Sequence, residues 1–389
     1  MTTLLAAIIL LGVIIFIHEL GHYLAARSIG VKVERFSIGY PPRLITLTSV
    51  PNGWEFRFFF YKKNNEGRLK WSTINTIKFS RPGRKGTGTE YCLAVVPFGG
   101  YVKVAGVMDE SMDTTFEHKP YELMSKPKWK QIWFMSAGVI MNTVLAFIIF
   151  TGLYNYTGKP VISKNPVIHE IIPDLPAFKA GLKSGDIIKS IEGKSIDTWN
   201  DITVEIYPRP NQEINLTYIR DDQLNSLNLI TSFQVNPETG DTLGAIGVRQ
   251  EFKYLPTSFI ESMQMGATAT VRGFGIIILS IRMLTSGQAS IKELGGPIMI
   301  AQLAGETAKA GWIPFLSLMA LISCNLAFIN ILPIPGLDGG HIFITLIEGI
   351  IRRPLTMKMR MAIQQIGMVL LLMLIVTVMV NDIGRLFSN

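Results

Sequence analysis

The 389-residue sequence predicts a membrane protein that is mainly α-helical, with four transmembrane helices, a membrane-associated β-rich region and one polar globular domain. Two observations support this architecture. Hydrophobic residues make up 48% of the chain and charged residues only 17%, with a mean hydropathy of +0.32, whereas a soluble domain carries about 25% charged residues. In addition, four apolar runs are each long enough to cross a hydrocarbon core of roughly 30 Å.

The composition also argues against some classes of protein. The formal net charge of +8 is modest for this length and gives no reason to expect a nucleic-acid partner. The two cysteines, Cys92 and Cys324, are far apart and indicate neither a disulfide framework nor a thiolate metal site. Met1-Thr2-Thr3 lacks the basic residues of a signal peptide, so we expect the first apolar run to be retained as a transmembrane helix.

The first predicted span, residues 1–26, contains a metal-binding pattern, His18-Glu19-Leu20-Gly21-His22. Residues four apart lie one above the other on a helix, so His18 and His22 can offer two imidazoles to one metal ion. Glu19 lies where a general base for a metal-bound water belongs. Ionisable side chains are costly inside a bilayer, which makes a chance match less common there than in a soluble chain. The pattern therefore predicts a metal site.

The remaining spans are predicted at residues 131–155, 312–332 and 361–381. The segment between the second and third spans ends in a linker, residues 251–311. Its amphipathic stretch carries charged residues, so we expect it to lie on the membrane surface or to pack as a linker helix.

Basic residues near the spans predict the orientation of the chain. Lys126, Lys128 and Lys130 precede the second span, and four basic residues lie in segment 333–360 after the third. Both segments are therefore expected on the cytoplasmic side. This places the polar globular domain and both termini outside the cytoplasm.

The cytoplasmic segment 27–130 is rich in alternating, strand-like patterns. Residues 89–105 are predicted to form two strands around a Pro/Gly turn. This hairpin could dip toward the metal site and hold a substrate strand with Gly99, Gly100 and Tyr101, or it could belong to a small cytosolic β-subdomain. Pattern alone leaves both possibilities open, since non-helical backbone at membrane depth requires a buried or wet environment.

The polar domain is predicted over residues 160–250. A strand near 167–172, a short helix at 176–182, a helix at 196–207 and a strand at 214–220 resemble, in this order, one PDZ domain. Such a domain takes an extended peptide or a C-terminus as an additional strand.

A third metal ligand is predicted in Leu337-Asp338-Gly339-Gly340-His341, within the loop and cytoplasmic segment 333–360. Two histidines, one carboxylate of Asp338 and an open position form a catalytic arrangement for zinc rather than a closed structural one. His341 is a possible outer partner. Asn325 and Asn330 in the third span serve either as interhelical hydrogen-bonding groups or as groups that hold a substrate and polarise its carbonyl.

These motifs resemble the site-2 protease family of intramembrane metalloproteases, of which bacterial regulators of the RseP type are the closest in pattern. The similarity covers nearly the whole chain, including residues 96–103 and 294–298. The resemblance implies one zinc ion bound by His18, His22 and Asp338, with Glu19 activating water. It also implies roles for Asn325 and Asn330 in substrate binding and catalysis.

The implied substrates are single-span membrane proteins, such as anti-sigma factors or signal-peptide remnants, cut inside the lipid bilayer after an earlier external cleavage. The PDZ domain would screen them, and the implied location is a bacterial inner membrane. Three features depart from the family pattern. Val139 replaces a common proline, residues 49–84 look like an insertion, and only one PDZ domain is evident where relatives often have two.

Two other functions share some of these sequence features. A PDZ-bearing adaptor with a structural metal site has no need of Glu19 beside the metal. A zinc transporter is expected to show internal repeats and ligands on several spans, and neither is visible in the sequence.

Overall fold

The structure is a computed structural model that describes residues 2–63, 68–106, 119–235, 242–250, 252–287, 290 and 295–388. The chain divides into two compact units. The helical unit comprises Met1–Leu153 and Met263–Asn389, and the small unit comprises Tyr154–Ser262.

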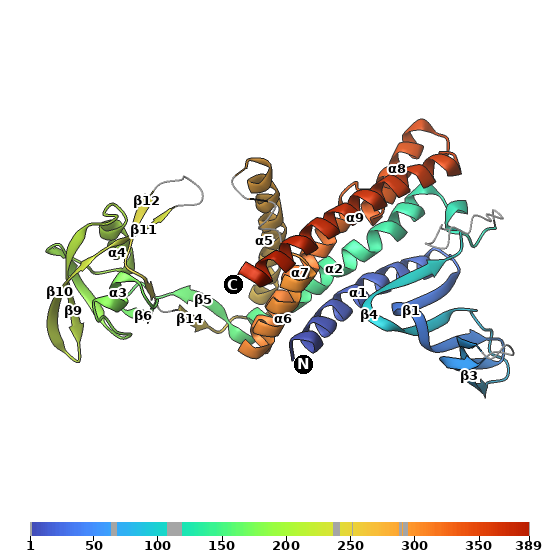
Figure 1. The fold of residues 1–389 in the computed structure, drawn as a ribbon, viewed down its shortest axis with the longest axis horizontal. Coiled ribbons are helices and arrows are strands. Elements are labelled where there is room, and N and C mark those ends of the chain that lie inside the picture. Colours follow the sequence, from blue (N-terminus) through green and yellow to red (C-terminus); the bar gives the residue numbers. More distant parts are fainter. Residues whose placement is uncertain are drawn as a thin grey trace. The chain divides into compact units, whose positions relative to one another are not determined.

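Long helices form the body of the helical unit (Figure 1). Among the described residues, five helices are long and apolar enough to cross a membrane. They are α1 (Thr2–Ser28), α2 (Lys128–Thr157), α5 (Phe259–Thr285), α7 (Trp312–Ile331) and α9 (Met357–Ser388). Two shorter helices, α6 (Pro297–Ala310) and α8 (Asp338–Ile351), and the 3₁₀ turn η1 (Leu123–Ser125) complete this set.

Helix α5 changes the expected count of four spans, which is not confirmed. The amphipathic stretch predicted to be a surface or linker helix is one continuous helix of 27 residues. Its charged residues, Glu261, Arg272 and Arg282, are far enough apart that an 18-residue window still has a mean hydropathy of 1.5. An amphipathic pattern and a span with scattered charges look alike in sequence, which explains the difference.

Small residues let α1 pack closely on its neighbours. Ala6, Ala7 and Leu10 of α1 are buried in one cluster with Ala304 of α6 and Met319 of α7. Without a hydrophobic driving force in lipid, such close backbone approach is a main source of helix association. The other end of α1 packs against α2 in a second cluster, which includes Ala25, Ala26, Phe134, Met135 and Ala137.

A four-stranded sheet follows α1. Its strands are β1 (Val33–Val50), β2 (Gly53–Lys63), β3 (Leu69–Ser80) and β4 (Glu90–Val104), in the order β3-β2-β1-β4. The sheet lies against α1 through β4 and β1, and Phe36 of β1 makes edge contacts with the rings of Phe16 and Tyr23 of α1.

Residues 89–105 form β-structure as predicted, but the two strands do not pair with each other as a hairpin. Phe36 pairs with Val102 on one side and with Tyr91 on the other, so the first half of β1 lies between the two halves of β4. The halves of β4 therefore do not pair with each other as a local hairpin. Alternation identifies strands but carries no information about which of them pair, so this interleaving could not be read from the sequence.

Residues 333–360 also differ from the loop that was expected. Asp338 is the first residue of α8, and His341 lies in the first turn of this helix. Gly339 and Gly340 are needed because the helix begins directly against the preceding chain. A Cβ at Gly339 would lie 2.5 Å from the carbonyl carbon of Ile331, and one at Gly340 would lie 2.8 Å from Cα of Pro335.

The small unit has a core of buried aliphatic residues between a four-stranded sheet and two short helices. The sheet has the order β10-β9-β7-β8, and the pairs β13–β6, β14–β5 and β11–β12 surround it. The elements are β5 (Lys159–Ile162), β6 (Ile168–Ile171), α3 (Pro176–Lys179), β7 (Ile187–Ile191), β8 (Lys194–Ser195), α4 (Trp199–Ile206), β9 (Glu213–Arg220), β10 (Gln223–Ile230), β11 (Ser232–Val235), β12 (Thr242–Ala245), β13 (Val248–Gln250) and β14 (Phe252–Leu255).

The helix expected at 196–207 is shorter because it has a defined start. Thr198 and Asp201 form a capping box that satisfies the first backbone N–H groups of α4. The half-buried Asp201 carboxylate accepts hydrogen bonds from the backbone and side chain of Thr198, which lower its pKa.

Candidate metal centre

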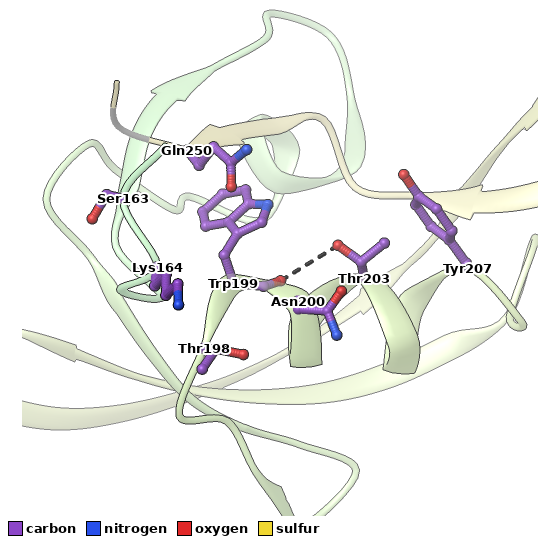
Figure 2. A pocket seen from close by; sticks show the side chains of 8 residues that line it. All are labelled: Ser163, Lys164, Thr198, Trp199, Asn200, Thr203, Tyr207 and Gln250. Atoms are coloured by element: carbon purple, nitrogen blue, oxygen red, sulfur yellow. Dashed lines mark hydrogen bonds between the residues drawn. The ribbon is translucent and has the colours of Figure 1, made fainter. Parts of the chain in front are cut away.

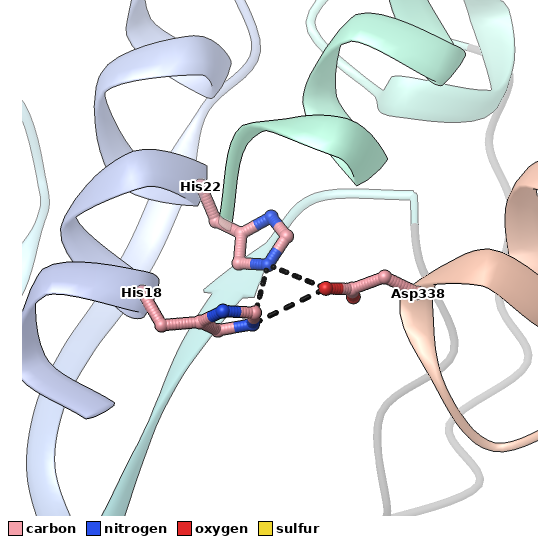
Figure 3. A group of neighbouring side chains, drawn as sticks. All are labelled: His18, His22 and Asp338. Atoms are coloured by element: carbon pink, nitrogen blue, oxygen red, sulfur yellow. Dashed lines mark hydrogen bonds and ion pairs between the residues drawn. The ribbon is translucent and has the colours of Figure 1, made fainter. Parts of the chain in front are cut away.

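Three side chains from two distant parts of the chain meet in the helical unit (Figure 3). His18 and His22 lie one turn apart on α1, and Asp338 reaches them from the start of α8. Nε2 of His18 lies 3.2 Å from Nε2 of His22. Oδ2 of Asp338 lies 3.2 Å from the first of these nitrogens and 3.3 Å from the second. The three ligand atoms thus form a nearly equilateral triangle.

The size of this triangle fits a tetrahedral zinc ion. Zinc lies about 2.0–2.1 Å from nitrogen or oxygen ligands, which gives a separation of about 3.3 Å between two ligands of a tetrahedron. Oδ2 of Asp338 is buried and has no hydrogen-bond partner among the described residues, although both imidazoles are close. A cation shared by the three atoms would satisfy this oxygen. Three protein ligands would leave one position of a tetrahedral ion for water or substrate.

The second nitrogen of each imidazole meets a group of α2. Nδ1 of His22 lies 2.9 Å from the carbonyl oxygen of Phe134, so Nδ1–H donates to that carbonyl and leaves Nε2 as a ligand atom. Nδ1 of His18 lies 3.3 Å from Nδ2 of Asn142, while the buried Oδ1 of Asn142 has no hydrogen-bond partner. Exchanging the two amide atoms of Asn142 lets Oδ1 accept a hydrogen bond from His18, which is the assignment we adopt.

Two glycines allow α2 to approach the metal ligands. A Cβ at Gly138 would lie 2.6 Å from Nε2 of both His18 and His22. A Cβ at Gly21 would lie 2.8 Å from the carbonyl carbon of Ala137. Both distances are too short for any side chain, so these positions require glycine for the two helices to meet here.

Glu19 faces the β-sheet. A Cβ at Gly100 would lie 3.5 Å from Cγ of Glu19, and the backbone of Val102 donates a hydrogen bond to the Glu19 carboxylate. The half of β4 that contains Gly100 therefore runs beside the predicted general base. Tyr101 of the same half accepts a hydrogen bond from Arg35 at 3.1 Å.

The other predicted site residues lie at different distances from the centre. Asn330 of α7 is buried, with Nδ2 3.4 Å from Nε2 of His18. Asn325 is half-buried one and a half turns earlier in α7, and none of its described hydrogen bonds joins it to the three ligands. His341 is half-buried, and its backbone carbonyl accepts a hydrogen bond from Thr345.

Sequence reasoning missed the contribution of α2. Gly138 and Asn142 were visible as small and polar residues in an apolar span, four residues apart, and both face the ligands. That spacing on one helical face was the available signal. Val139, which departs from the family pattern in this span, argued against a role for the span. Val139 is itself buried, and its backbone carbonyl accepts a hydrogen bond from Thr143.

Comparisons with known proteins point to a family of zinc peptidases. The family model described as peptidase family M50 matches residues 6–63 and 74–374. A putative zinc metalloprotease of Clostridium acetobutylicum is 30% identical over 379 residues, which cover 97% of this chain and 96% of the relative. The regulator of sigma-W protease RasP of Bacillus subtilis is 28% identical over 425 residues, which cover 99% of each chain.

Among solved structures, the chain is similar to the PDZ domain of an SdrC-like protein from Listeria monocytogenes, with a TM-score of 0.20 and 18% identity. That match covers 23% of this chain and 90% of the other.

The family match corrects one expectation. Residues 49–84 were expected to be an insertion, but the family model leaves only residues 64–73 unmatched in this region. Most of β2 and β3 therefore belongs to the shared pattern. The match over nearly the whole chain, together with the apolar helices, identifies a multi-pass membrane protein that uses zinc. The chain belongs to peptidase family M50, the site-2 proteases, and is a zinc metalloprotease.

Proposed function

We propose that this protein hydrolyses peptide bonds within the transmembrane segments of single-span membrane proteins. The proposal assigns His18, His22 and Asp338 as the ligands of one zinc ion and Glu19 as the general base. The observation that carries it is the triangle of ligand atoms, two of them on α1, a helix long enough to span a membrane, and the third at the start of the shorter helix α8. Polar and ionisable groups at such depth are rarely retained without a function.

The chain supplies most of the catalytic machinery. Zinc bound by the three ligands would act as a Lewis acid toward water and toward the carbonyl group of the substrate. Glu19 would accept a proton from water at its carboxylate and pass it to the amine that leaves. Asn330 is close enough to the ligands to donate a hydrogen bond to the carbonyl oxygen as negative charge develops there. Asn325 would contribute farther along the substrate, and His341 would support the ligand Asp338 from the same helix.

The substrate would bind as an extended strand. A helical peptide bond is shielded by neighbouring side chains and its carbonyl is already hydrogen-bonded, so the substrate must unwind before cleavage. The half of β4 that contains Gly99, Gly100 and Tyr101 pairs with β1 on one side, and its other side runs beside Glu19. A substrate strand added to this edge would bring its backbone next to the general base.

The small unit would screen substrates as a PDZ domain. A pocket of about 540 Å³ lies between α4 and β13 (Figure 2). Trp199, Thr203 and Tyr207 line it from the helical side and Gln250 lines it from β13. An extended peptide beside β13 would place side chains in this pocket, which accounts for selection of substrates that an earlier protease has shortened.

Contacts within the helical unit support four crossings of the membrane. Glu348 binds both Lys128 at the start of α2 and Arg360 near the start of α9, so these helices start at one end and run in parallel. α5 packs beside Thr151 near the far end of α2, and Asp382 near the far end of α9 binds the first residues of α6.

The chain therefore lies at the same end of the helices before α5 and at the start of α6. The segment that contains α5 thus makes no net crossing of the membrane. Basic residues mark the opposite end as cytoplasmic, so the small unit and both termini lie outside the cytoplasm. In a bacterium, this arrangement corresponds to the inner membrane.

Cleavage by a variant of Glu19 tests the proposal. A tagged single-span substrate with a short external segment is incubated with the reconstituted protein, and zinc is measured in each preparation. Glu19→Gln should retain zinc and lose cleavage, whereas the matched change at exposed Glu306 of α6 should leave both unchanged. Cleavage by Glu19→Gln at the wild-type rate would remove Glu19 from the mechanism. Bound zinc with no cleavage of any such substrate by the wild type would favour a PDZ-bearing adaptor.

A further inference from the structure

The segment that contains the ribbon formed by β2 and β3, residues 49–84, is strongly basic. Residues 49–84 contain eight Lys and Arg against two Glu, whereas the formal net charge of the whole chain is +8. The metal centre uses none of these residues. Figure 1 shows the β2–β3 ribbon projecting to the side of α1 rather than beyond its end.

The ribbon is apolar on one face, which we call the aromatic face. It comprises Trp54, Phe56, Phe58, Ile77 and Phe79, because β2 pairs with β3 in the register Trp54↔Phe79 and Phe56↔Ile77, and directly opposed side chains share a face. Ile77 is 42% exposed and Phe79 is 57% exposed. Opposite these residues the other face is polar, although farther along β2 it continues with Phe59 and Tyr61. Arg57 and Lys78 both lie close to Glu55 on the polar part, at 2.6 and 4.0 Å.

The aromatic face continues the surface that covers α1. Across the sheet, Phe56 pairs with Leu47, Leu47 with Tyr91, and Tyr91 with Phe36. Phe36 and Tyr91 in turn contact the rings of α1 residues. One side of the sheet therefore packs on a membrane-spanning helix and then extends sideways, past that helix, as exposed aromatic and aliphatic side chains.

The end of the helices next to the sheet has the residues of a membrane interface. Trp129 and Trp133 of α2 are 64% and 45% exposed, and Trp133 donates a hydrogen bond to the Ser28 hydroxyl at the end of α1. Exposed tryptophans at the end of a span lie at the level of lipid headgroups. Only four residues connect α1 to β1, so the sheet starts at this level.

We propose that the β2–β3 ribbon lies in the membrane interface and binds anionic phospholipid headgroups. Its aromatic face enters the acyl boundary, and Lys62, Lys63 and Lys70 near its tip contact the headgroups. A basic segment next to a transmembrane helix is attracted to the negative surface of the cytoplasmic leaflet. Burial of the aromatic face in the acyl boundary adds a hydrophobic contribution to the free energy of membrane binding. The ladder of the sheet links the ribbon, through β1 and the first half of β4, to the half of β4 beside Glu19, so this anchor would fix the depth of that strand.

Depth measurements on two adjacent residues test the proposal. A nitroxide label is placed on Ile77→Cys or on Thr76→Cys in the full chain, with Cys92 and Cys324 changed to serine, in phosphatidylcholine vesicles with or without phosphatidylglycerol. Thr76 pairs with Arg57 and therefore lies on the polar face of the same strand. The label at position 77 should be more accessible to oxygen than to a water-soluble nickel complex, with the reverse at position 76. Phosphatidylglycerol should increase this contrast at least several-fold.

A charge variant separates anionic headgroups from simple hydrophobic insertion. Changing Lys62, Lys63 and Lys70 together to Gln should abolish the effect of phosphatidylglycerol, whereas the same change at Lys179, Lys183 and Lys189 of the small unit should not. A label at position 77 that stays in water in both lipids would overturn the proposal. So would a label shielded from both probes, which indicates a protein neighbour, or equal insertion with and without phosphatidylglycerol. None of these readouts depends on peptide hydrolysis, so they remain informative if the proposed protease activity fails.

Discussion

At the scale of single residues, the metal centre depends on groups that are not ligands. Imidazole binds a metal through one nitrogen only if the other carries the proton, and that proton is held by a hydrogen bond. Phe134 supplies the acceptor for His22 and Asn142 supplies the acceptor for His18. Both groups belong to α2, which contributes no ligand itself.

We predict that Asn142→Leu weakens zinc binding. Without an acceptor for Nδ1–H, His18 loses its fixed orientation, and loss of such outer partners costs on the order of 10- to 100-fold in metal affinity. Competition with a chromophoric chelator measures this change. Thr143→Ala is the matched control, because among the described residues the Thr143 hydroxyl bonds only to the carbonyl of Val139 in its own helix. Unchanged zinc affinity in Asn142→Leu would show that His18 is oriented by another group.

Gly138→Ala should remove zinc. The new methyl group would lie 2.6 Å from both ligand nitrogens, so the imidazoles or α2 must move. Gly152→Ala in the same helix is the control, since a Cβ there has no neighbour within 4 Å, and it should stabilise α2 by about 0.5–1 kcal/mol. Zinc content and apparent Tm distinguish the two variants. Full zinc occupancy in Gly138→Ala would contradict the close packing of α1 and α2.

At the scale of elements, α8 positions Asp338 and is itself held by a buried carboxylate. The side chain of Glu348 is fully buried, and it binds Lys128 of α2 at 2.5 Å, Arg360 of α9, and the backbone N–H of Leu355 at 2.8 Å. Removing one partner of a buried ion pair leaves the others uncompensated. The helix that supplies the third metal ligand is therefore coupled to two spans through one side chain.

Glu348→Ala should destabilise the protein by about 3–5 kcal/mol, the usual cost of breaking a buried pair, and should reduce zinc content because α8 carries Asp338. Glu261→Ala is the comparison. Glu261 forms an exposed pair with Lys159 at 3.5 Å, and exposed pairs contribute about 0–1 kcal/mol. Apparent Tm in detergent provides the measurement. Similar Tm values for the two variants would contradict the anchoring role of Glu348.

The same cluster predicts a dependence on pH. Burial acts to raise the pKa of Glu348, but hydrogen bonds from Lys128, Leu355 and Arg360 hold the pKa below its ordinary value. A lowered folded-state pKa stabilises the protein above the unfolded pKa of about 4.3, and this contribution is lost as pH falls further. Below that pH, the apparent Tm of the wild type should fall more steeply than that of Glu348→Gln. Parallel curves would exclude the cluster as the acid-sensitive element.

The sequence indicated which residues lie together where the relevant spacing was local. His18, Glu19 and His22 lie within one turn and a half of a helix, and a helical period is enough to bring their side chains to the same region. Asp338 was found because the prolines before it break an apolar span. The contributions of Asn142 and Gly138 depend on how α2 packs against α1, which no local pattern encodes. The interleaving of β1 with β4 was missed for the same reason.

At the scale of the whole molecule, the proposed function requires the helices to bring water to a depth from which lipid would otherwise exclude it. The proposed ligands lie on α1 and α8, the groups that would orient them lie on α2, and Asn330 lies on α7. The sheet adds a strand beside Glu19. Sequence alone predicted a membrane protein with a metal site and a separate polar domain, but the count of spans depended on α5, whose scattered charges fit two interpretations.

The central claim is that this arrangement cuts peptide bonds inside a membrane span. Mass spectrometry of the products from a reconstituted single-span substrate tests it most directly, because the new termini give the position of the cut. We predict new termini within the apolar segment of the substrate, present with the wild type and absent with Glu19→Gln. Termini found only in the polar flanking segments, or the same termini with both proteins, would contradict the claim.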